Sequence, residues 1–259
     1  MKPILDKSLF REKTMTDSGS LAAMSSIIHK LARKGEYRGI VYRGAVKVGT
    51  FAVSVCDCAE PPVPGEALPK QAGIDLVTLD NSAGRKSREG VPSFSLRTGG
   101  FLVLSVSTGS GEYAVELFLR EQKTEPEKVF DSRKLGTGDL FIANIIRPGT
   151  YEIRNSSEKT HASLTVEYPG TGQIVGRIPP VVVECKEHAI SPAEVRVQPR
   201  QALMFSCMQE SRIIIELKKA DDRPRPARTP AKVRPAGQKK RTTGSAGPKK
   251  ILRKIRFFG

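Results

Sequence analysis

Short apolar runs closed by turns constrain the fold most strongly, and they are clearest in residues 139–168. The runs 140–146 and 151–154 are rich in β-branched and aromatic residues, and they meet at Pro148-Gly149. Proline presets φ for the first position of a turn and glycine accepts the positive φ of the second, so this dipeptide predicts a β-turn between two strands. A third run, 162–168, follows a polar turn. We therefore expect three consecutive antiparallel strands, the repeating unit of a β-sandwich.

The first of these strands carries a pattern that a regular strand cannot satisfy. Leu140, Ile142 and either Ile145 or Ile146 cannot all point to one face, because side chains alternate along a strand. We therefore expect a bulge or irregularity between Ala143 and Ile146. The sequence Gly136-Thr-Gly-Asp139 before this strand is typical of a turn, so Asp139 is interpreted as a turn residue.

A helical pattern precedes the strands, in residues 16–34. Asp17, Ser18 and Ser20 are candidate N-cap residues, and basic residues precede Gly35, as at a helix C-terminus. The pattern predicts one amphipathic helix of about four turns whose apolar stripe packs on the sheet or on another subunit. Its apolar positions recur at three- and four-residue steps: Leu21, Met24, Ile27, Ile28 and Leu31.

Further runs of the same kind extend over most of the chain. Residues 37–58 predict two or three strands with turns or bulges at glycines, and residues 72–168 supply about seven strands. We expect an all-β protein with one or two antiparallel β-sandwiches. The expected parts are an N-terminal arm and helix (1–36), a β-sandwich domain (37–178), further strands (179–222) and a basic tail (223–259). The strands of 179–222 either form a second small sandwich or complete the first.

The segment 185–217 resembles the cupredoxin-like β-sandwich domains. Ile190-Ser-Pro-Ala-Glu-Val-Arg-Val-Gln-Pro199 gives a proline-containing entry into an alternating strand, and Ala202-Leu-Met-Phe-Ser forms a second apolar strand after a turn. The resemblance implies a sandwich fold. Cupredoxins hold copper with two histidines, a cysteine and usually a weak axial methionine, whereas Cys207-Met208 is followed by no histidine. We therefore expect the fold without the copper.

The candidate metal ligands and catalytic groups lack the spacing that their chemistry needs. Structural zinc sites use pairs of ligands separated by two to four residues, but Cys56 and Cys58 are too close together and Cys185 and Cys207 are single. We interpret the cysteines as reduced residues of strands. His29, His161 and His188 stand in no motif, so they are interpreted as surface or cap residues. We expect no metal, no cofactor and no catalytic residue, and hence not an enzyme.

Charge is concentrated at the C-terminus. The chain of 259 residues carries a formal charge of +16. Only 6% of its residues are aromatic and it has no Trp, which is a low aromatic content for one large hydrophobic core. Residues 223–259 hold thirteen of the forty-three Lys and Arg and none of the twenty-seven Asp and Glu, so the rest is near +3. Rich in Pro and Gly and poor in apolar residues, the tail is expected to be disordered in isolation. Its cations are Arg223, Arg225, Arg228, Lys232, Arg234, Lys239, Lys240, Arg241, Lys249, Lys250, Arg253, Lys254 and Arg256.

The tail suggests three partners. Its cation density is typical of segments that coat nucleic-acid backbones or other polyanions without reading sequence. Alternatively, its final segment docks on a protein groove or on an anionic membrane surface. That segment would use a face of four apolar residues, Ile251, Leu252, Ile255 and Phe258. A merely solubilising tail is a further interpretation, and self-association is left open.

The N-terminus and the hydropathy bear on location. The first residues carry charges where a signal peptide needs an apolar core, and no apolar run reaches the roughly 18–20 residues that span a bilayer. We expect a cytoplasmic protein without a transmembrane segment.

Overall fold

Strands form nearly all of the regular structure of this protein. The computed structural model describes residues 14–57, 68–80, 90–109, 111–120, 125–168 and 178–221. The chain divides into two units, Met1–Asp222 and Arg223–Gly259, and the second lies outside the described residues. One four-residue helix, α2 (Leu76–Leu79), occurs in the described part, where no helix is long and apolar enough to cross a membrane. The all-β prediction is confirmed.

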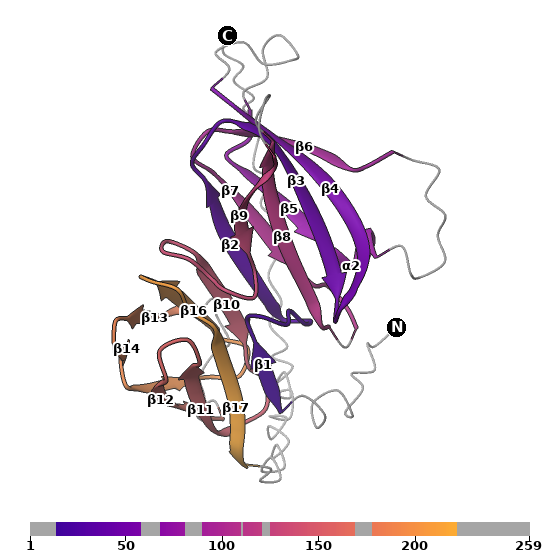
Figure 1. The fold of residues 1–259 in the computed structure, drawn as a ribbon. Coiled ribbons are helices and arrows are strands. Elements are labelled where there is room, and N and C mark those ends of the chain that lie inside the picture. The colour runs from indigo at the N-terminus through magenta and orange to yellow at the C-terminus, as the bar shows by residue number, and fades with distance from the viewer. Residues whose placement is uncertain are drawn as a thin grey trace, which may run out of the picture. The chain divides into compact units, whose positions relative to one another are not determined.

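In the described residues, seventeen strands make three sheets (Figure 1). The seven-stranded central sheet has the order β14-β13-β16-β10-β2-β7-β5. The β3 sheet has the order β6-β4-β3-β8-β9, and the β11 sheet has the order β1-β17-β11-β12-β15. The strand bounds are β1 (Met15–Asp17), β2 (Ser25–Leu31), β3 (Gly35–Arg43), β4 (Val46–Cys56), β5 (Gln71–Asp75), β6 (Ser93–Arg97), β7 (Gly100–Ser105), β8 (Tyr113–Arg120), β9 (Glu127–Asp131), β10 (Leu140–Asn144), β11 (Gly149–Asn155), β12 (Thr160–Val166), β13 (Val181–Lys186), β14 (Ala189–Ser191), β15 (Glu194–Val197), β16 (Ala202–Cys207) and β17 (Ile213–Ala220).

The sheets are mixed, which corrects the expectation of purely antiparallel sandwiches. Parallel pairs join β4 to β6, β5 to β7, β12 to β15 and β13 to β16. A parallel pair requires a long connection, because the chain must return to the same end of the sheet. The connections between β4 and β6 and between β12 and β15 contain a strand of the central sheet, so the chain passes from one layer to the other and back.

The core lies on one face of the central sheet. Ile27 of β2 is flanked by Leu104 of β7 and Phe141 of β10, and Phe141 by Phe205 of β16; all four are fully buried. The alternate residues of these strands are half-buried or exposed. The β3 sheet and the β11 sheet therefore both contribute to the core on the same side of the central sheet. Two sandwiches result, and they share one layer.

The strand order reveals an internal duplication. The segment β1–β8 and the segment β9–β17 follow the same path, so β2, β3, β4, β5, β6, β7 and β8 correspond to β10, β11, β12, β13, β15, β16 and β17. The short strand β14 and the helix α2 have no counterpart. The two copies meet where β2 pairs with β10 in antiparallel orientation. Ile27 and Phe141 are equivalent residues, 114 positions apart, and they pair with each other, so a pseudo-twofold axis passes between them.

Each copy gives its first strand to the other. β1 pairs with β17, the last strand of the second copy, and β9 pairs with β8, the last strand of the first (Figure 1). The exchange makes each sandwich depend on both halves of the sequence. Neither the β3 sheet nor the β11 sheet is complete without a strand from the other copy.

The same five-residue motif follows both exchanged strands, Asp17-Ser18-x-x-Leu21 after β1 and Asp131-Ser132-x-x-Leu135 after β9. The Ser18 Oγ accepts from the Ile213 N–H at 3.0 Å, and the Ser132 Oγ accepts from the Val115 N–H at 2.8 Å. The two serines and the two leucines are fully buried. Equal bonds at equivalent places show that the motif fastens each exchanged strand to its host sheet.

A second repeated motif turns the chain from the central sheet into the facing sheet, namely Arg33-x-Gly35-x-Tyr37 and Arg147-x-Gly149-x-Tyr151. In each, the tyrosine hydroxyl donates to the arginine carbonyl, at 2.6 and 2.7 Å. Gly35 and Gly149 have φ of 145° and 152°, and a Cβ on Gly149 would lie 2.5 Å from the Lys219 carbonyl oxygen. Glycine is therefore required at this corner.

This corner corrects the hairpin predicted at Pro148-Gly149. β10 belongs to the central sheet and β11 to the β11 sheet, so the two strands flanking the dipeptide do not pair. The predicted bulge is also wrong, because β10 ends at Asn144 with an unbroken register. Phe141, Ala143 and Ile145 are the inward residues. The polar turn after Asn155 does join a hairpin, β11 with β12.

The N-terminal helix is wrong as well. Residues 25–31 form β2, in which Ser25, Ile27 and Leu31 point into the core while Ile28 faces outward. The three- and four-residue steps between Leu21, Met24, Ile27, Ile28 and Leu31 are compatible with a helix, but parts of the same pattern are also compatible with a strand, so the spacing alone does not decide between them. Pairing with β7 and β10 on both sides satisfies the backbone of β2, so the central sheet determines the outcome.

Replacing either motif serine by alanine is expected to destabilise the fold by a similar amount. Ser18→Ala and Ser132→Ala each leave a buried backbone N–H without its side-chain acceptor, which costs about 1–3 kcal/mol. The free energy of unfolding from urea titrations measures both, with Ser26→Ala, on the half-buried outer face, as the control. A cost at only one of the two positions would contradict their equivalence.

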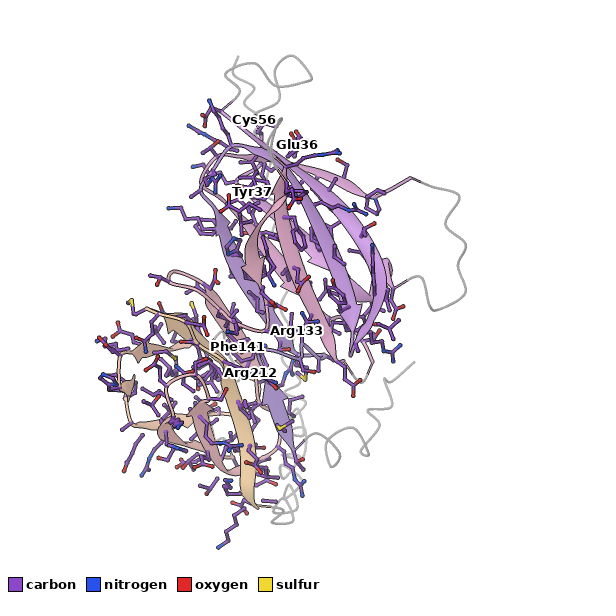
Figure 2. All side chains as sticks on the ribbon, viewed as in Figure 1. Glu36, Tyr37, Cys56, Arg133, Phe141 and Arg212 are labelled. Carbon is purple, nitrogen blue, oxygen red and sulfur yellow. The ribbon has the colours of Figure 1, made fainter. Side chains whose placement is uncertain are left out.

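Phe141→Ala is expected to lower the free energy of unfolding by about 3–5 kcal/mol, because Phe141 is fully buried beside Phe205, with ring centroids 5.9 Å apart (Figure 2). Phe118→Ala removes the same group from a half-buried outward position and should cost much less. Equal losses in denaturant titrations would show that the faces are assigned wrongly.

Candidate functional site

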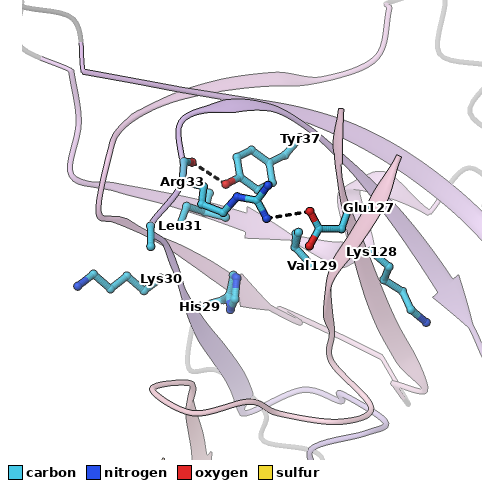
Figure 3. A pocket seen from close by; sticks show the side chains of 9 residues that line it. His29, Lys30, Leu31, Arg33, Tyr37, Glu127, Lys128 and Val129 are labelled. Atoms are coloured by element: carbon cyan, nitrogen blue, oxygen red, sulfur yellow. Dashed lines mark hydrogen bonds and ion pairs between the residues drawn. The ribbon is translucent and has the colours of Figure 1, made fainter. Parts of the chain in front are cut away.

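An open groove of about 340 Å³ lies beside β2, between the first corner and the exchanged strand β9 (Figure 3). One side is lined by residues of the first copy, from β2 and from the corner at Arg33-x-Gly35-x-Tyr37. The other side is lined by residues of β9, which belongs to the second copy. The groove therefore exists only because β9 is exchanged into the first sandwich. Its lining residues are His29, Lys30, Leu31, Ala32, Arg33, Tyr37, Glu127, Lys128 and Val129.

A histidine held by a carboxylate borders this groove. The His29 Nδ1 lies 2.7 Å from the Asp139 Oδ1, and the side chains are 16% and 5% exposed. The imidazole also packs against Phe130 of β9, with ring centroids 4.3 Å apart. Because a carboxylate oxygen accepts hydrogen bonds, the geometry fits the tautomer in which the His29 Nδ1–H donates to Asp139 and Nε2 keeps its lone pair.

The duplication shows that the fold does not need this histidine. The equivalent positions in the other sandwich hold Ala143 in place of His29 and Ser25 in place of Asp139. Ser25 still performs the turn function, because its Oγ accepts from the Ala22 N–H, as the Asp139 Oδ2 accepts from the Gly136 N–H. Asp139 differs from Ser25 by having a second side-chain oxygen, Oδ1, and this oxygen contacts His29.

The remaining charged groups give the groove a net positive charge, because Lys30, Arg33 and Lys128 line it together with one carboxylate, that of Glu127. The Arg33 Nη1 lies 2.8 Å from the Glu127 Oε2 and joins the corner to β9 (Figure 3). The carboxylates of Glu116 and Asp131 raise the pKa of Lys128, and burial raises the pKa of Tyr37. These groups keep their charged and neutral forms, respectively, at neutral pH. The described lining of the groove holds no Ser, Thr or Cys.

Five exposed cations, here called the basic rim, stand at the same end of this sandwich. Backbone contacts place three of them together, because Lys30 is opposite Phe101, whose N–H donates to the Lys70 carbonyl, and the Arg97 N–H donates to the carbonyl of Pro69. The other two, Lys34 and Arg120, lie beside Glu36, which follows Lys34 by two residues and is opposite Arg120. Among the described residues none of the five has an ion-pair partner, whereas Glu127, one of the nearby carboxylates, is engaged by Arg33. The other acidic residues near this end are Glu36, Asp57 and Glu125. The basic rim consists of Lys30, Lys34, Lys70, Arg97 and Arg120.

The predicted sites fall in different places. All thirteen tail cations and the docking face of Ile251, Leu252, Ile255 and Phe258 lie outside the described residues, as does Cys58. His161 lies on β12 with its Nδ1 3.0 Å from the Glu152 Oε1, and His188 is an exposed turn residue. His29 is the one histidine whose interpretation as a surface or cap residue is wrong.

The cysteines occupy strand positions, as expected for those that are described. Cys185 and Cys207 are opposite each other on β13 and β16, and both are fully buried. The hydrogen bond with the Cys185 thiol, together with burial, raises the pKa of Cys207. Cys207 is therefore a protonated core thiol, unsuited to nucleophilic chemistry. Cys56 is half-buried at the end of β4 (Figure 2).

Sequence reasoning missed the His29–Asp139 pair because it missed the duplication. The signal was available: Asp-Ser-x-x-Leu followed twelve residues later by Arg-x-Gly-x-Tyr occurs at 17–37 and again at 131–151. Aligning the two copies would have set His29 against Ala143 and exposed the asymmetry. No family model, curated protein or solved structure matches the chain, so comparison with known proteins identifies no site residue.

A double-mutant cycle tests the His29–Asp139 pair. His29→Ala leaves a buried carboxylate oxygen without its partner, and Asp139→Ser leaves the imidazole without one, so each should destabilise the fold. The double variant recreates the Ala143 and Ser25 arrangement and should cost less than the sum of the single variants by about 0.5–3 kcal/mol. Urea titration of the four proteins measures the coupling. Strict additivity would mean that the pair contributes nothing.

Proposed function

We propose that the protein is a non-catalytic binding protein whose cations engage the phosphate backbone of a nucleic acid. The observation that carries the proposal is the uncompensated charge of the C-terminus, thirteen Lys and Arg without one Asp or Glu. Neutralising phosphates releases condensed counterions, which gives affinity without sequence preference. The thirteen tail cations are the proposed contacts.

The basic rim supports this proposal from within the folded unit. Its five cations are exposed and form no ion pair with a described residue, whereas two cations on the outer faces of the β3 and β11 sheets are engaged, Lys128 with Glu116 and Lys218 with Glu152. A charge already neutralised by a neighbouring carboxylate gains little from a phosphate, and an unpaired one gains more. We therefore propose the rim as a second, weaker phosphate contact, added to that of the tail.

Salt dependence is the first test. If the full-length protein engages on the order of 6–10 phosphates, its affinity for a duplex should fall by about 10³–10⁵ between 50 and 200 mM salt. Fluorescence anisotropy with two duplexes of unrelated sequence measures this, and a 1–222 truncation should bind far more weakly. Binding that survives high salt but disappears with Ile255→Asp would instead support the docking peptide, because apolar contacts are not screened.

Substitutions in the rim separate its contribution from that of the tail. In the full-length protein, Lys30→Gln, Lys70→Gln and Arg97→Gln together should lower the slope of log affinity against log salt by up to about 3, near 1 for each lost phosphate contact. The matched control replaces two lysines and one arginine away from the rim, Lys47, Lys159 and Arg200, which are also exposed and form no ion pair with a described residue. If the two triple variants lower the slope equally, the loss of net charge explains the effect and a specific contact at the rim is excluded.

A further inference from the structure

The outer face of the central sheet is apolar across the boundary between the two copies. Register puts Val182, Met204 and Ile142 in one row across β13, β16 and β10, and Leu140, Ile28 and Val103 in the next row across β10, β2 and β7. Phe101, 41% exposed, and Val182, 50% exposed, stand at its two ends. We call this set the apolar stripe: Ile28, Phe101, Val103, Leu140, Ile142, Val182 and Met204.

Two exposed methionines extend the stripe on either side. Met24 is 39% exposed beside Asn144, to whose N–H its carbonyl is bonded, and Met208 is 49% exposed just beyond β16. Charged side chains on this face stand at its margins, namely Lys30, Asp75, Glu184 and Lys186. Among the described residues, the outward side chains of β16 and β10, and those of β2 before Lys30, are therefore uncharged.

The duplication indicates that the stripe is more than chance exposure. Ile28 and Ile142 are equivalent by the 114-residue relation, and Val103 and Met204 are equivalent through the pairing of β7 and β16 in their copies. Both copies thus place large aliphatic side chains at the same outward positions. Where one face of a sheet is in water, the outward residues are normally polar.

The outer faces of the other two sheets follow that normal pattern. On the β11 sheet, the Arg154 Nη2 lies 3.2 Å from the Glu216 Oε2, and the Lys218 Nζ lies 2.9 Å from the Glu152 Oε2. On the β3 sheet, Arg133 contacts Glu116 and lies over the Tyr42 ring, 4.9 Å from its centroid (Figure 2). These faces carry ion pairs beside their apolar residues, such as Ile40 and Phe118 on the β3 sheet, whereas the stripe is a continuous set of apolar side chains.

We propose that the apolar stripe is the interface of a homodimer, in which the central sheets of two copies of this chain pack face to face. The stripe crosses five strands, about 19 Å at the usual strand spacing, whereas a helix covers only about 10 Å. A second flat sheet fits this width. The chain itself supplies one with a matching charge-free centre, which the charged outer faces of the β3 and β11 sheets cannot offer.

The size of the face is adequate for a stable dimer. The five strands of the stripe span about 19 Å and three outward rows along them span about 17 Å, so the footprint of the stripe is roughly 320 Å² for each copy, and that of the whole seven-stranded face, charged margins included, is roughly 500 Å². A corrugated surface buries more accessible area than its footprint, which approaches the roughly 800 Å² that each partner buries in a standard interface. An isologous dimer would set each stripe against its own copy and would exclude Ile28, Ile142 and Met204 from water together.

Sedimentation velocity over a concentration series tests the proposal on the full-length protein. The sample is nuclease-treated and kept at high salt, so that association through nucleic acid is removed and failure of the proposed function would not affect the result. We expect a monomer–dimer equilibrium. Ile142→Lys at the centre of the stripe should raise the dissociation constant at least about 100-fold, and Val182→Lys at its end should raise it less.

The control is Ile40→Lys, the same change at a half-buried outward position of β3. It should leave the dissociation constant unchanged, and circular dichroism should show that all variants are folded. Because Val182 is already half exposed, Val182→Lys keeps the test valid if Ile142→Lys does not fold. A monomer at every concentration, a dimer indifferent to Val182→Lys and Ile142→Lys, or equal dissociation by Ile40→Lys would each overturn the proposal.

Discussion

The antiparallel pairing of β2 with β10 is the contact on which the rest of the structure depends. It joins two copies of one β-sandwich into a continuous seven-stranded sheet, with Ile27 and Phe141 facing each other on the pseudo-twofold axis. Because each copy also sends its first strand to the other, the two sandwiches share backbone hydrogen bonds as well as core side chains. Folding of either half is thereby coupled to folding of the other.

Duplication also separates what the fold requires from what one copy has added. The serine after each exchanged strand and the tyrosine at each corner recur with the same bonds, so they serve the architecture. His29 with Asp139 has no such counterpart, and neither does the basic rim as a set. We place the candidate site beside β2 and β9 because these features occur in only one of two otherwise equivalent copies, so the fold does not require them.

Two surfaces of different chemistry follow from the shared sheet. Its inner face is the core, while its outer face carries the apolar stripe, and the basic rim stands at one end of the first sandwich. A dimer through the stripe would leave that end accessible, since the rim lies at the margin of the stripe and not across it. The two proposals therefore use separate groups, apart from Lys30 at their border.

The sequence by itself determined the β class, the turn at Asp139, the β11–β12 hairpin and the segregation of charge into the tail, because alternation, turn chemistry and composition are local properties. Tertiary structure decided the rest. Residues 25–31 became a strand because β7 and β10 pair with both of its edges, and Pro148-Gly149 became a corner because the strands flanking it belong to different sheets. The partnership of His29 with Asp139, 110 residues apart, required the pairing of β2 with β10, which puts the residue before Leu140 opposite the residue after Ile28 and which no local pattern encodes.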